Sequence, residues 1–288
     1  MKRWPLLVSL VLIAAITAGC ATLDEKQRAW IFQPSDRSWN GALAAADGMD
    51  DVWIDLKARP KEEPGRLHGL WLAAERPDAP ILLYLHGARY NVTGSAPRMR
   101  RMQELGFSVL AVDYRGFGKS TPLLPSEESA NEDARSAWDW LAAKYPGRPR
   151  YIFGHSLGGP IAINLAAAVD DERGTIVENT FTSIADVVSS SKWGWLPVSM
   201  LITQRFEAVR QVGKIGSPLL VVHGGEDQLI LPDLGRKLFE AAAEPKLFVL
   251  VEGGSHHNTN QVGQPQYRQA LAQLFSLKQE APTGLVSP

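Results

Sequence analysis

Gly154-His155-Ser156-Leu157-Gly158 stands between two segments of different character. The short apolar run at 149–153 predicts a buried strand, and residues 159–168 predict a helix. A serine in a tight turn between a strand and a helix presents its hydroxyl at the edge of a sheet, and the G-x-S-x-G spacing is typical of a nucleophile. The helix N-terminus behind it would favour a developing oxyanion. A glycine-rich turn with an ordinary serine is the simpler alternative.

The composition indicates one globular domain without a polyanionic partner. The 288 residues suffice for one large α/β domain. The 30 Lys and Arg residues and the 31 Asp and Glu residues are mixed along the chain and give a formal net charge of −1. We therefore expect no nucleic-acid partner. The single cysteine, Cys20, excludes an intrachain disulfide and a thiolate metal cluster. Nothing in the sequence indicates the oligomeric state.

The first residues have the pattern of a bacterial export signal. A charged start at Met1-Lys2-Arg3 precedes an apolar stretch at 6–16 and the small-residue site Thr17-Ala18-Gly19-Cys20. The end of this segment resembles a lipobox, in which the cysteine becomes the lipidated first residue of the mature protein. We therefore expect residues 1–19 to be a signal peptide and Cys20 to be the lipidation site. A plain secretory signal and an uncleaved anchor are the alternatives.

A lipidated Cys20 would place the protein in the cell envelope. Acyl chains on this residue would hold the domain to a bilayer surface, on the periplasmic side or outside the cell. Ala21 stands where an aspartate signals inner-membrane retention in the class that this segment resembles, so we expect the outer membrane where the source has one. Residues 20–50 would then be a lipidated tether and an N-terminal segment that packs on the body.

Apolar strands alternate with helical patterns over the rest of the chain. Residues 52–56 and 67–72 have the alternation of an antiparallel edge hairpin. Further strands are predicted at 81–85, 107–112, 151–153, 175–178, 219–222 and 247–251, and helices at 98–105, 128–144, 160–169, 234–243 and 265–278. This order predicts an α/β fold with a mostly parallel central sheet and helices on both faces. Residues 182–215 interrupt the alternation and predict a small helical cap.

Two loops that follow predicted strands supply partners for Ser156. A serine hydroxyl needs an adjacent base, and the base needs a carboxylate that orients it. Asp227 has room to turn back toward a histidine, and Glu226 is the alternative acid. His256 and His257 are both candidates for the base. The order Ser, Asp, His and the position of both loops at the C-terminal ends of parallel strands are typical of a catalytic triad.

Other loops have predicted roles of their own. The backbone N–H groups of Ala88 and Leu157 are the expected oxyanion donors. His86 and His223 fall outside the Ser-Asp-His order, so we expect them to be structural. Residues 113–120 lack the spacing of a phosphate-binding loop, which excludes nucleotide binding there. They predict a glycine-shaped turn whose arginine is held by local hydrogen bonds.

Five motifs in order resemble the α/β-hydrolase superfamily, and most of all its serine aminopeptidase/depalmitoylase-like branch of small esterases. They are Leu85-His86-Gly87, Asp113-Tyr114-Arg115-Gly116-Phe117-Gly118-Lys119-Ser120, Gly154-His155-Ser156-Leu157-Gly158-Gly159, His223-Gly224-Gly225-Glu226-Asp227 and Gly253-Gly254-Ser255-His256, and they span about residues 65–278. The resemblance implies Ser156 as nucleophile, Asp227 as acid and His256 as base, with no metal and no organic cofactor. His257, which Asn258 follows, matches a variant of the last loop and is the alternative base.

We therefore expect a serine hydrolase of the carboxylesterase or thioesterase kind, with its α/β-hydrolase domain at 51–280. It would act on a small molecule through an acyl-enzyme. The expected bond is an acyl ester or thioester, because the predicted cap is short and apolar. A peptidase or amidase with the same triad is one alternative. A non-catalytic envelope lipoprotein on a hydrolase fold is another, although every catalytic position is filled. Ala88-Arg89-Tyr90 departs from the commonest oxyanion-loop pattern.

Overall fold

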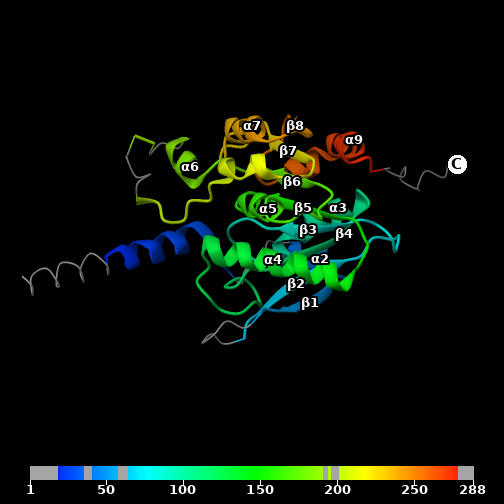
Figure 1. Ribbon diagram of the computed structural model, residues 1–288, viewed down its shortest axis with the longest axis horizontal. Coiled ribbons are helices and arrows are strands. Elements are labelled where there is room, and N and C mark those ends of the chain that lie inside the picture. Colours follow the sequence, from blue (N-terminus) through cyan, green and yellow to red (C-terminus); the bar gives the residue numbers. More distant parts are fainter. Residues whose placement is uncertain (1–18, 36–40, 58–63, 191–193, 196–200, 278–288) are drawn as a thin grey trace, which may run out of the picture.

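The structure is a computed structural model that describes residues 19–35, 41–57, 64–190, 194–195 and 201–277. An eight-stranded sheet forms its centre, with the strand order β1-β2-β4-β3-β5-β6-β7-β8 (Figure 1). The strands are β1 (Asp50–Asp55), β2 (Arg66–Leu72), β3 (Ile81–Leu85), β4 (Ser108–Val112), β5 (Arg150–His155), β6 (Thr175–Glu178), β7 (Leu219–Gly224) and β8 (Lys246–Val251).

The sheet is parallel from β4 to β8 and ends in an antiparallel hairpin at its other edge. β1 pairs antiparallel with β2, and β2 pairs antiparallel with β4. All other neighbours are parallel. The predicted mostly parallel sheet and edge hairpin are therefore confirmed. The chain steps from β3 out to β4 and returns to β5 on the other side of β3, which creates the kind of switch point where open α/β sheets bind ligands.

Helices cover both faces of the sheet, as predicted. They are α2 (Ala42–Ala46), α3 (Ala96–Glu104), α4 (Glu127–Lys144), α5 (Gly158–Ala166), α6 (Ile184–Ser190), α7 (Pro232–Ala241), α8 (Thr259–Val262) and α9 (Gln264–Phe275). Leu83 and Leu85 of β3 share a core with α4, α5 and α7, whereas Leu82 and Tyr84 share one with α3 and α9. Both faces of β3 are buried, which explains why its sequence is continuously apolar.

β8 is less buried than its apolar sequence predicted. Its first four residues are half-buried and Leu250 is 41% exposed. The reason is its position at the edge of the sheet, where β7 is its one neighbouring strand. An apolar run does not by itself distinguish an edge strand from a central one.

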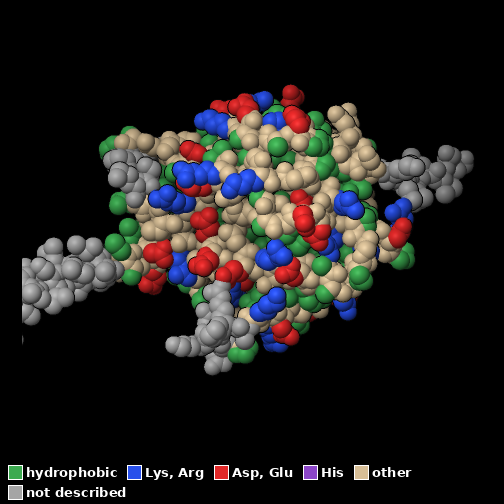
Figure 2. Space-filling view, in the orientation of Figure 1, with side chains coloured by type: hydrophobic (Ala, Val, Ile, Leu, Met, Phe, Trp, Pro, Cys, Tyr) green, Lys and Arg blue, Asp and Glu red, His purple; other side chains and the backbone are tan. Residues whose placement is uncertain are grey.

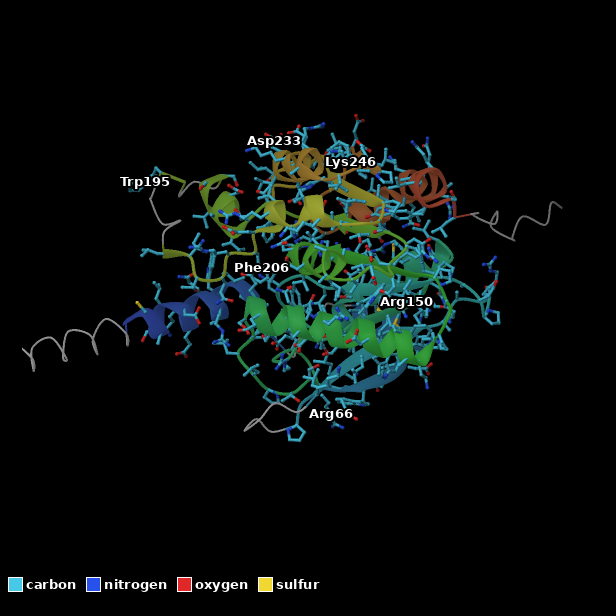
Figure 3. The ribbon with its side chains drawn as sticks, in the orientation of Figure 1. Arg66, Arg150, Trp195, Phe206, Asp233 and Lys246 are labelled. Carbon is cyan, nitrogen blue, oxygen red and sulfur yellow. The ribbon has the colours of Figure 1, made fainter. Side chains whose placement is uncertain are left out.

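A helix at residues 19–32 precedes the sheet and inserts its end into the body. Phe32 is fully buried and meets the rings of Phe117 and Phe206 edge to face, with centroids 6.3 and 5.8 Å away. Figure 3 shows Phe206 where this helix meets the body. Gln27 donates its side-chain amide to the carbonyl oxygen of Leu201 at 2.6 Å. The helix is therefore packed against the protein along part of its length.

The predicted signal peptide lies almost wholly outside the described residues, which begin at residue 19. Cys20 is exposed and its thiol is free. No helix within the described ranges has both the length and the apolar character needed to cross a membrane. In the coloured part of Figure 2, basic and acidic side chains are interspersed over the visible face.

The short helical cap of the predicted fold is described in part. α6 and two 3-10 helices, η3 (Ala208–Arg210) and η4 (Val212–Lys214), lie within it. Residues 191–193 and 196–200 lie outside the described ranges. α6 supplies apolar side chains to the pocket that contains Ser156.

The turn at 113–120 has the structural role expected of it. Gly116 and Gly118 adopt φ angles of 90° and 48°, which favour glycine. Arg115 donates Nε to Oδ1 of Asp133 at 2.7 Å and Nη2 to Oε2 of Glu132 at 2.8 Å. Both acids belong to α4, so Arg115 ties the turn to that helix.

Candidate active site

Ser156 occupies a left-handed turn between β5 and α5, with a φ of 55°. Its N–H donates to the carbonyl oxygen of Glu178 at 3.0 Å, and its own carbonyl accepts the N–H of Gly159 at 2.9 Å. A Cβ on Gly154 would lie 2.3 Å from the carbonyl oxygen of Gly158 and 2.7 Å from the Cβ of Ala162, and one on Gly158 would lie 2.1 Å from the carbonyl oxygen of Leu85 at the end of β3. The turn therefore needs glycine on both sides of the serine.

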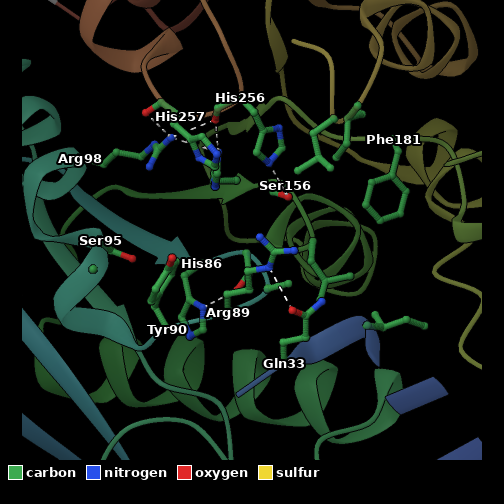
Figure 4. Close-up of a pocket in the computed structure, with 18 of the residues that line it drawn as sticks. Gln33, His86, Arg89, Tyr90, Ser95, Arg98, Ser156, Phe181, His256 and His257 are labelled. Carbon is green, nitrogen blue, oxygen red and sulfur yellow. Dashed lines mark hydrogen bonds between the residues drawn. The ribbon is translucent and has the colours of Figure 1, made fainter. Parts of the chain in front are cut away.

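The structure brings the three predicted triad residues together (Figure 4). His256 Nε2 lies 3.0 Å from Ser156 Oγ, and His256 Nδ1 lies 2.8 Å from Asp227 Oδ2. Asp227 and His256 are buried, at 2% and 7% exposure, whereas Glu226 is exposed. In the Nδ1–H tautomer, Nε2 can accept the serine proton while Nδ1–H donates to the carboxylate.

The Asp227 carboxylate is aimed by its own loop. Its Oδ1 accepts the N–H groups of Leu229 and Ile230, each at 2.9 Å, which leaves Oδ2 for His256. His223 lies behind it, fully buried, with Nε2 2.9 Å from the carbonyl oxygen of Ile230. Burial lowers the pKa of His223, so the ring is neutral near pH 7. This agrees with the structural role that we expected for His223.

The two residues predicted to supply the oxyanion donors line the same pocket as Ser156. Leu157 directly precedes α5, so its N–H belongs to the unsatisfied start of a helix. Ala88 follows β3 and lines the same pocket as Ser156. Neither N–H has a hydrogen-bond acceptor among the described residues. A Cβ added to Gly87 would lie 3.0 Å from the Cβ of Ser156, so this loop passes close to the serine.

A buried ion pair that sequence reasoning missed supports the His256 loop. Arg98 of α3 donates Nε to Oε1 of the fully buried Glu178 at 3.0 Å. Its Nη2 donates to the carbonyl oxygens of His257 at 3.0 Å and of His256 at 3.3 Å. Tyr267 donates its hydroxyl to the other Glu178 oxygen at 2.6 Å. Arg98 thus ties the histidine loop to the end of β6.

Asn179 holds the same loop from the next position along the chain. Its Nδ2 donates to the carbonyl oxygen of Ser255 and to Oγ1 of Thr259, both at 3.1 Å. Its Oδ1 accepts the N–H of Gly224 at 2.8 Å. One buried amide side chain therefore connects the loops that follow β7 and β8. The sequence signal for this network was a Glu-Asn pair at the end of an apolar strand, where buried polar groups need partners.

Two further histidines of the pocket lining, His155 and His257, have different positions. His155 is buried, and its pKa lies well below the usual range because burial and the charge of Arg98 disfavour the imidazolium. His257 lines the pocket, with its ring edge-to-face against His256 at 5.3 Å between centroids. Burial and the neighbouring His256 lower the pKa of His257. His256 is the one of the adjacent pair that contacts both Ser156 and Asp227.

Ser156 opens into a cavity of about 290 Å³. Its apolar lining comes from the N-terminal helix, the serine turn, the segment after β6, the cap and the acid loop: Trp30, Ile31, Leu157, Phe181, Ile184, Val187, Leu229 and Ile230. Figure 4 shows Phe181 on one side of Ser156 and Ser95, Tyr90 and Arg98 on the other. The described lining includes Arg89 and Arg98 but no Asp or Glu. Within the described ranges, no group of three or more His, Cys, Asp or Glu side chains could hold a metal ion.

The loops of the site follow the strands of the sheet in a characteristic order. A parallel sheet with a serine turn after β5, an acid loop after β7 and a histidine loop after β8 is the arrangement of α/β-hydrolases. The family model described as serine aminopeptidase, S33, matches residues 76–205. The chain belongs to the α/β-hydrolase superfamily.

The chain matches one relative over most of that protein's length and another over about half of it. The chain is 30% identical over 262 residues to the uncharacterized protein MT2364 of Mycobacterium tuberculosis, and the match covers 90% of each. It is 32% identical over 209 residues to the lysophosphatidylserine lipase ABHD12 of Danio rerio, which covers 62% of this chain and 54% of that protein. The solved structure of the esterase Pf2001 of Pyrococcus furiosus has a TM-score of 0.65 at 18% identity, over 85% of this chain and 98% of that one, and supports the fold alone.

Replacing Arg98 by Met should lower the free energy of unfolding by about 3–5 kcal/mol, because it leaves the buried Glu178 carboxylate without its partner. The double variant Arg98→Met/Glu178→Gln should recover part of that loss. Chemical unfolding of the three proteins measures both effects. Arg135→Met is the matched control, since its ion pair with Asp139 is exposed. Equal losses for Arg98→Met and Arg135→Met would contradict the role given to the buried pair.

Proposed function

We propose that the protein is a serine hydrolase that cleaves carboxylic esters through a covalent acyl-enzyme. Ser156 is the nucleophile, His256 the general base and Asp227 the acid that orients it. The observation that supports this assignment is the continuous path from Ser156 Oγ to His256 Nε2, at 3.0 Å, and from His256 Nδ1 to Asp227 Oδ2, at 2.8 Å. The assignment also agrees with the superfamily to which the chain belongs.

Acylation begins when Ser156 Oγ attacks the ester carbonyl and His256 Nε2 accepts its proton. Asp227 keeps Nδ1–H toward itself and stabilises the imidazolium that forms. The N–H groups of Ala88 and Leu157 bind the oxyanion, at roughly 3–4 kcal/mol for each donor. The tetrahedral intermediate collapses as Nε2–H protonates the departing alcohol oxygen. The acyl group is then an ester of Ser156.

Deacylation repeats the steps with water in place of serine. His256 Nε2 removes a proton from water, whose oxygen attacks the acyl carbonyl while the same two N–H groups bind the oxyanion. Collapse returns the proton to Ser156 Oγ and releases the carboxylic acid. A thioester would follow the same course with a thiol as the leaving group.

The lining of the pocket favours an ester over the N-terminal peptide bond that an aminopeptidase cleaves. An aminopeptidase must accommodate the α-ammonium group of its substrate, which an acidic side chain would stabilise. The charged side chains in the described lining are instead Arg89 and Arg98. Arg98 is ion-paired with Glu178, so the positive charge of the lining comes from Arg89. A positive charge there disfavours an ammonium group and tolerates a neutral or anionic leaving group.

We infer that the substrates are single-chain acyl esters, a class that includes lysophospholipids. The apolar lining, which includes Phe181 and Ile184, would cover an acyl chain. The arginine-bearing part would face the polar leaving group. That a relative is named a lysophosphatidylserine lipase supports this substrate class.

Changing the acid tests the proposed function with a matched neighbour as control. Asp227→Asn should lower kcat/KM for a short acyl p-nitrophenyl ester by about 10⁴, because the amide favours the wrong histidine tautomer. The kcat/KM of Glu226→Gln should stay near the wild-type value, since Glu226 is exposed. Equal effects of the two changes would contradict the triad. Faster turnover of an aminoacyl p-nitroanilide than of the ester would support the peptidase alternative, and a folded wild type without turnover would support a binding protein.

We also propose that Cys20 is lipidated and holds the enzyme at a bilayer surface in the cell envelope, with its domain in the periplasm or outside the cell. The lipobox-like sequence and the exposure of Cys20 support this. Cys20→Ser should move the protein from the membrane fraction to the soluble fraction of lysed cells, as measured by immunoblot. Unchanged membrane retention of a processed Cys20→Ser chain would contradict anchoring through this residue.

A further inference from the structure

The loop that carries Ala88 has an unusual backbone. The two residues after Ala88, Arg89 and Tyr90, have φ angles of 70° and 60°. Left-handed conformations cost a residue with a side chain roughly 1–2 kcal/mol each. Two in succession persist only when the surrounding structure holds them. The position of the Ala88 amide therefore depends on what holds the two residues that follow.

The contacts to these residues come from the end of the N-terminal helix. The N–H of Arg89 donates to the carbonyl oxygen of Phe32 at 2.8 Å. Arg89 Nε donates to Oε1 of Gln33 at 3.1 Å, and Tyr90 forms a parallel β-bridge with Pro34. Figure 4 shows the Arg89 and Gln33 side chains directed toward each other below Ser156. Three successive residues thus contact the oxyanion loop.

The end of this helix is itself fixed. The ring of Phe32 is fully buried between Phe117 and Phe206, which places its carbonyl group. The side-chain amide of Gln33 donates to the carbonyl oxygen of Trp30 at 2.8 Å, so its oxygen is left facing Arg89. The helix end is therefore a rigid support for the loop.

We propose that residues 32–34 hold the oxyanion loop in its active conformation, and that Phe32 and Gln33 are positioning residues of the hydrolase. This inference rests on the proposed function, because it concerns the Ala88 donor. The segment lies before the whole α/β sheet in sequence and forms no part of the triad. The same helix includes Cys20, twelve residues before Phe32, or about 18 Å along a helix. The segment between the proposed anchor and the sheet thus positions a part of the active site.

Gln33 gives the sharper test because its side chain is exposed and its replacement spares the core. On a neutral short acyl ester, Gln33→Ala should lower kcat about three- to tenfold with KM within twofold, since a displaced oxyanion donor weakens transition-state binding alone. Gln33→Glu keeps the oxygen acceptor and should recover most of the kcat. Adding Arg89→Ala to Gln33→Ala should cost no more than the worse single change.

Phe32 tests the backbone contact, with Phe107 as the matched control. Both rings are fully buried, but Phe107 belongs to the core on the other face of the sheet. Phe32→Leu and Phe107→Leu should lower the Tm to a similar extent. The Phe32 change alone should lower kcat about tenfold and speed hydrogen exchange over residues 86–91.

Three outcomes distinguish a failure of this inference from a failure of the proposed function. If wild-type hydrolysis depends on Ser156 but Gln33→Ala and Phe32→Leu both keep the wild-type kcat and exchange rates, the positioning role is wrong and the triad stands. If Gln33→Ala changes KM alone, the residue contacts substrate and does not position the loop. If wild-type hydrolysis does not depend on Ser156, the proposed function itself is wrong. Should Phe32→Leu fail to fold, the Gln33 series decides.

Discussion

The left-handed backbone at Ser156 is the constraint on which the site depends. At a φ of 55°, the turn lifts the serine hydroxyl out of the sheet and aims the start of α5 at the same point. The turn requires that Gly154 and Gly158 lack side chains, because atoms of α5 and of the end of β3 occupy the space that a Cβ would fill. Such close packing is possible where β3 and β5 are neighbours, at the switch point of the strand order.

Around this turn, buried polar side chains fix the loops that complete the site. Arg98, Asn179 and Asp227 each make several hydrogen bonds to loop backbone, and most of these bonds are at least partly shielded from water. A preorganised site loses little free energy to reorientation when charge develops in the transition state. The same shielding makes the network costly to leave incomplete, because an unpaired buried charge has no water to solvate it.

Much of the fold could be predicted from the sequence because its signals are local. The strands lie within one or two residues of the predicted ranges, and the proximity of Ser156, Asp227 and His256 follows because the C-terminal ends of parallel strands meet at one edge of the sheet. The exposure of β8 was missed, since an apolar run does not reveal an edge. The choice between His256 and His257 depends on side-chain direction, which adjacent residues of the same type do not encode.

The residues that hold the loops of the site could not be predicted from the sequence, for a different reason. Arg98 and Glu178 are 80 residues apart, and Gln33 and Arg89 are 56 apart. Each residue taken alone looks like a solvated charge or an ordinary polar side chain. Their roles come from tertiary contacts that periodicity and motif spacing do not report.

Covalent labelling tests whether His256 and Asp227 make Ser156 a nucleophile. The protein would be treated with a fluorophosphonate, digested with trypsin and mapped by mass spectrometry. Tryptic cleavage gives the peptide 151–173, in which Ser156 is the single serine. We expect one adduct, on Ser156, that forms on the native protein, is absent after heat unfolding and forms far more slowly in His256→Ala. A folded wild type that stays unlabelled, or an adduct at another residue, would contradict it.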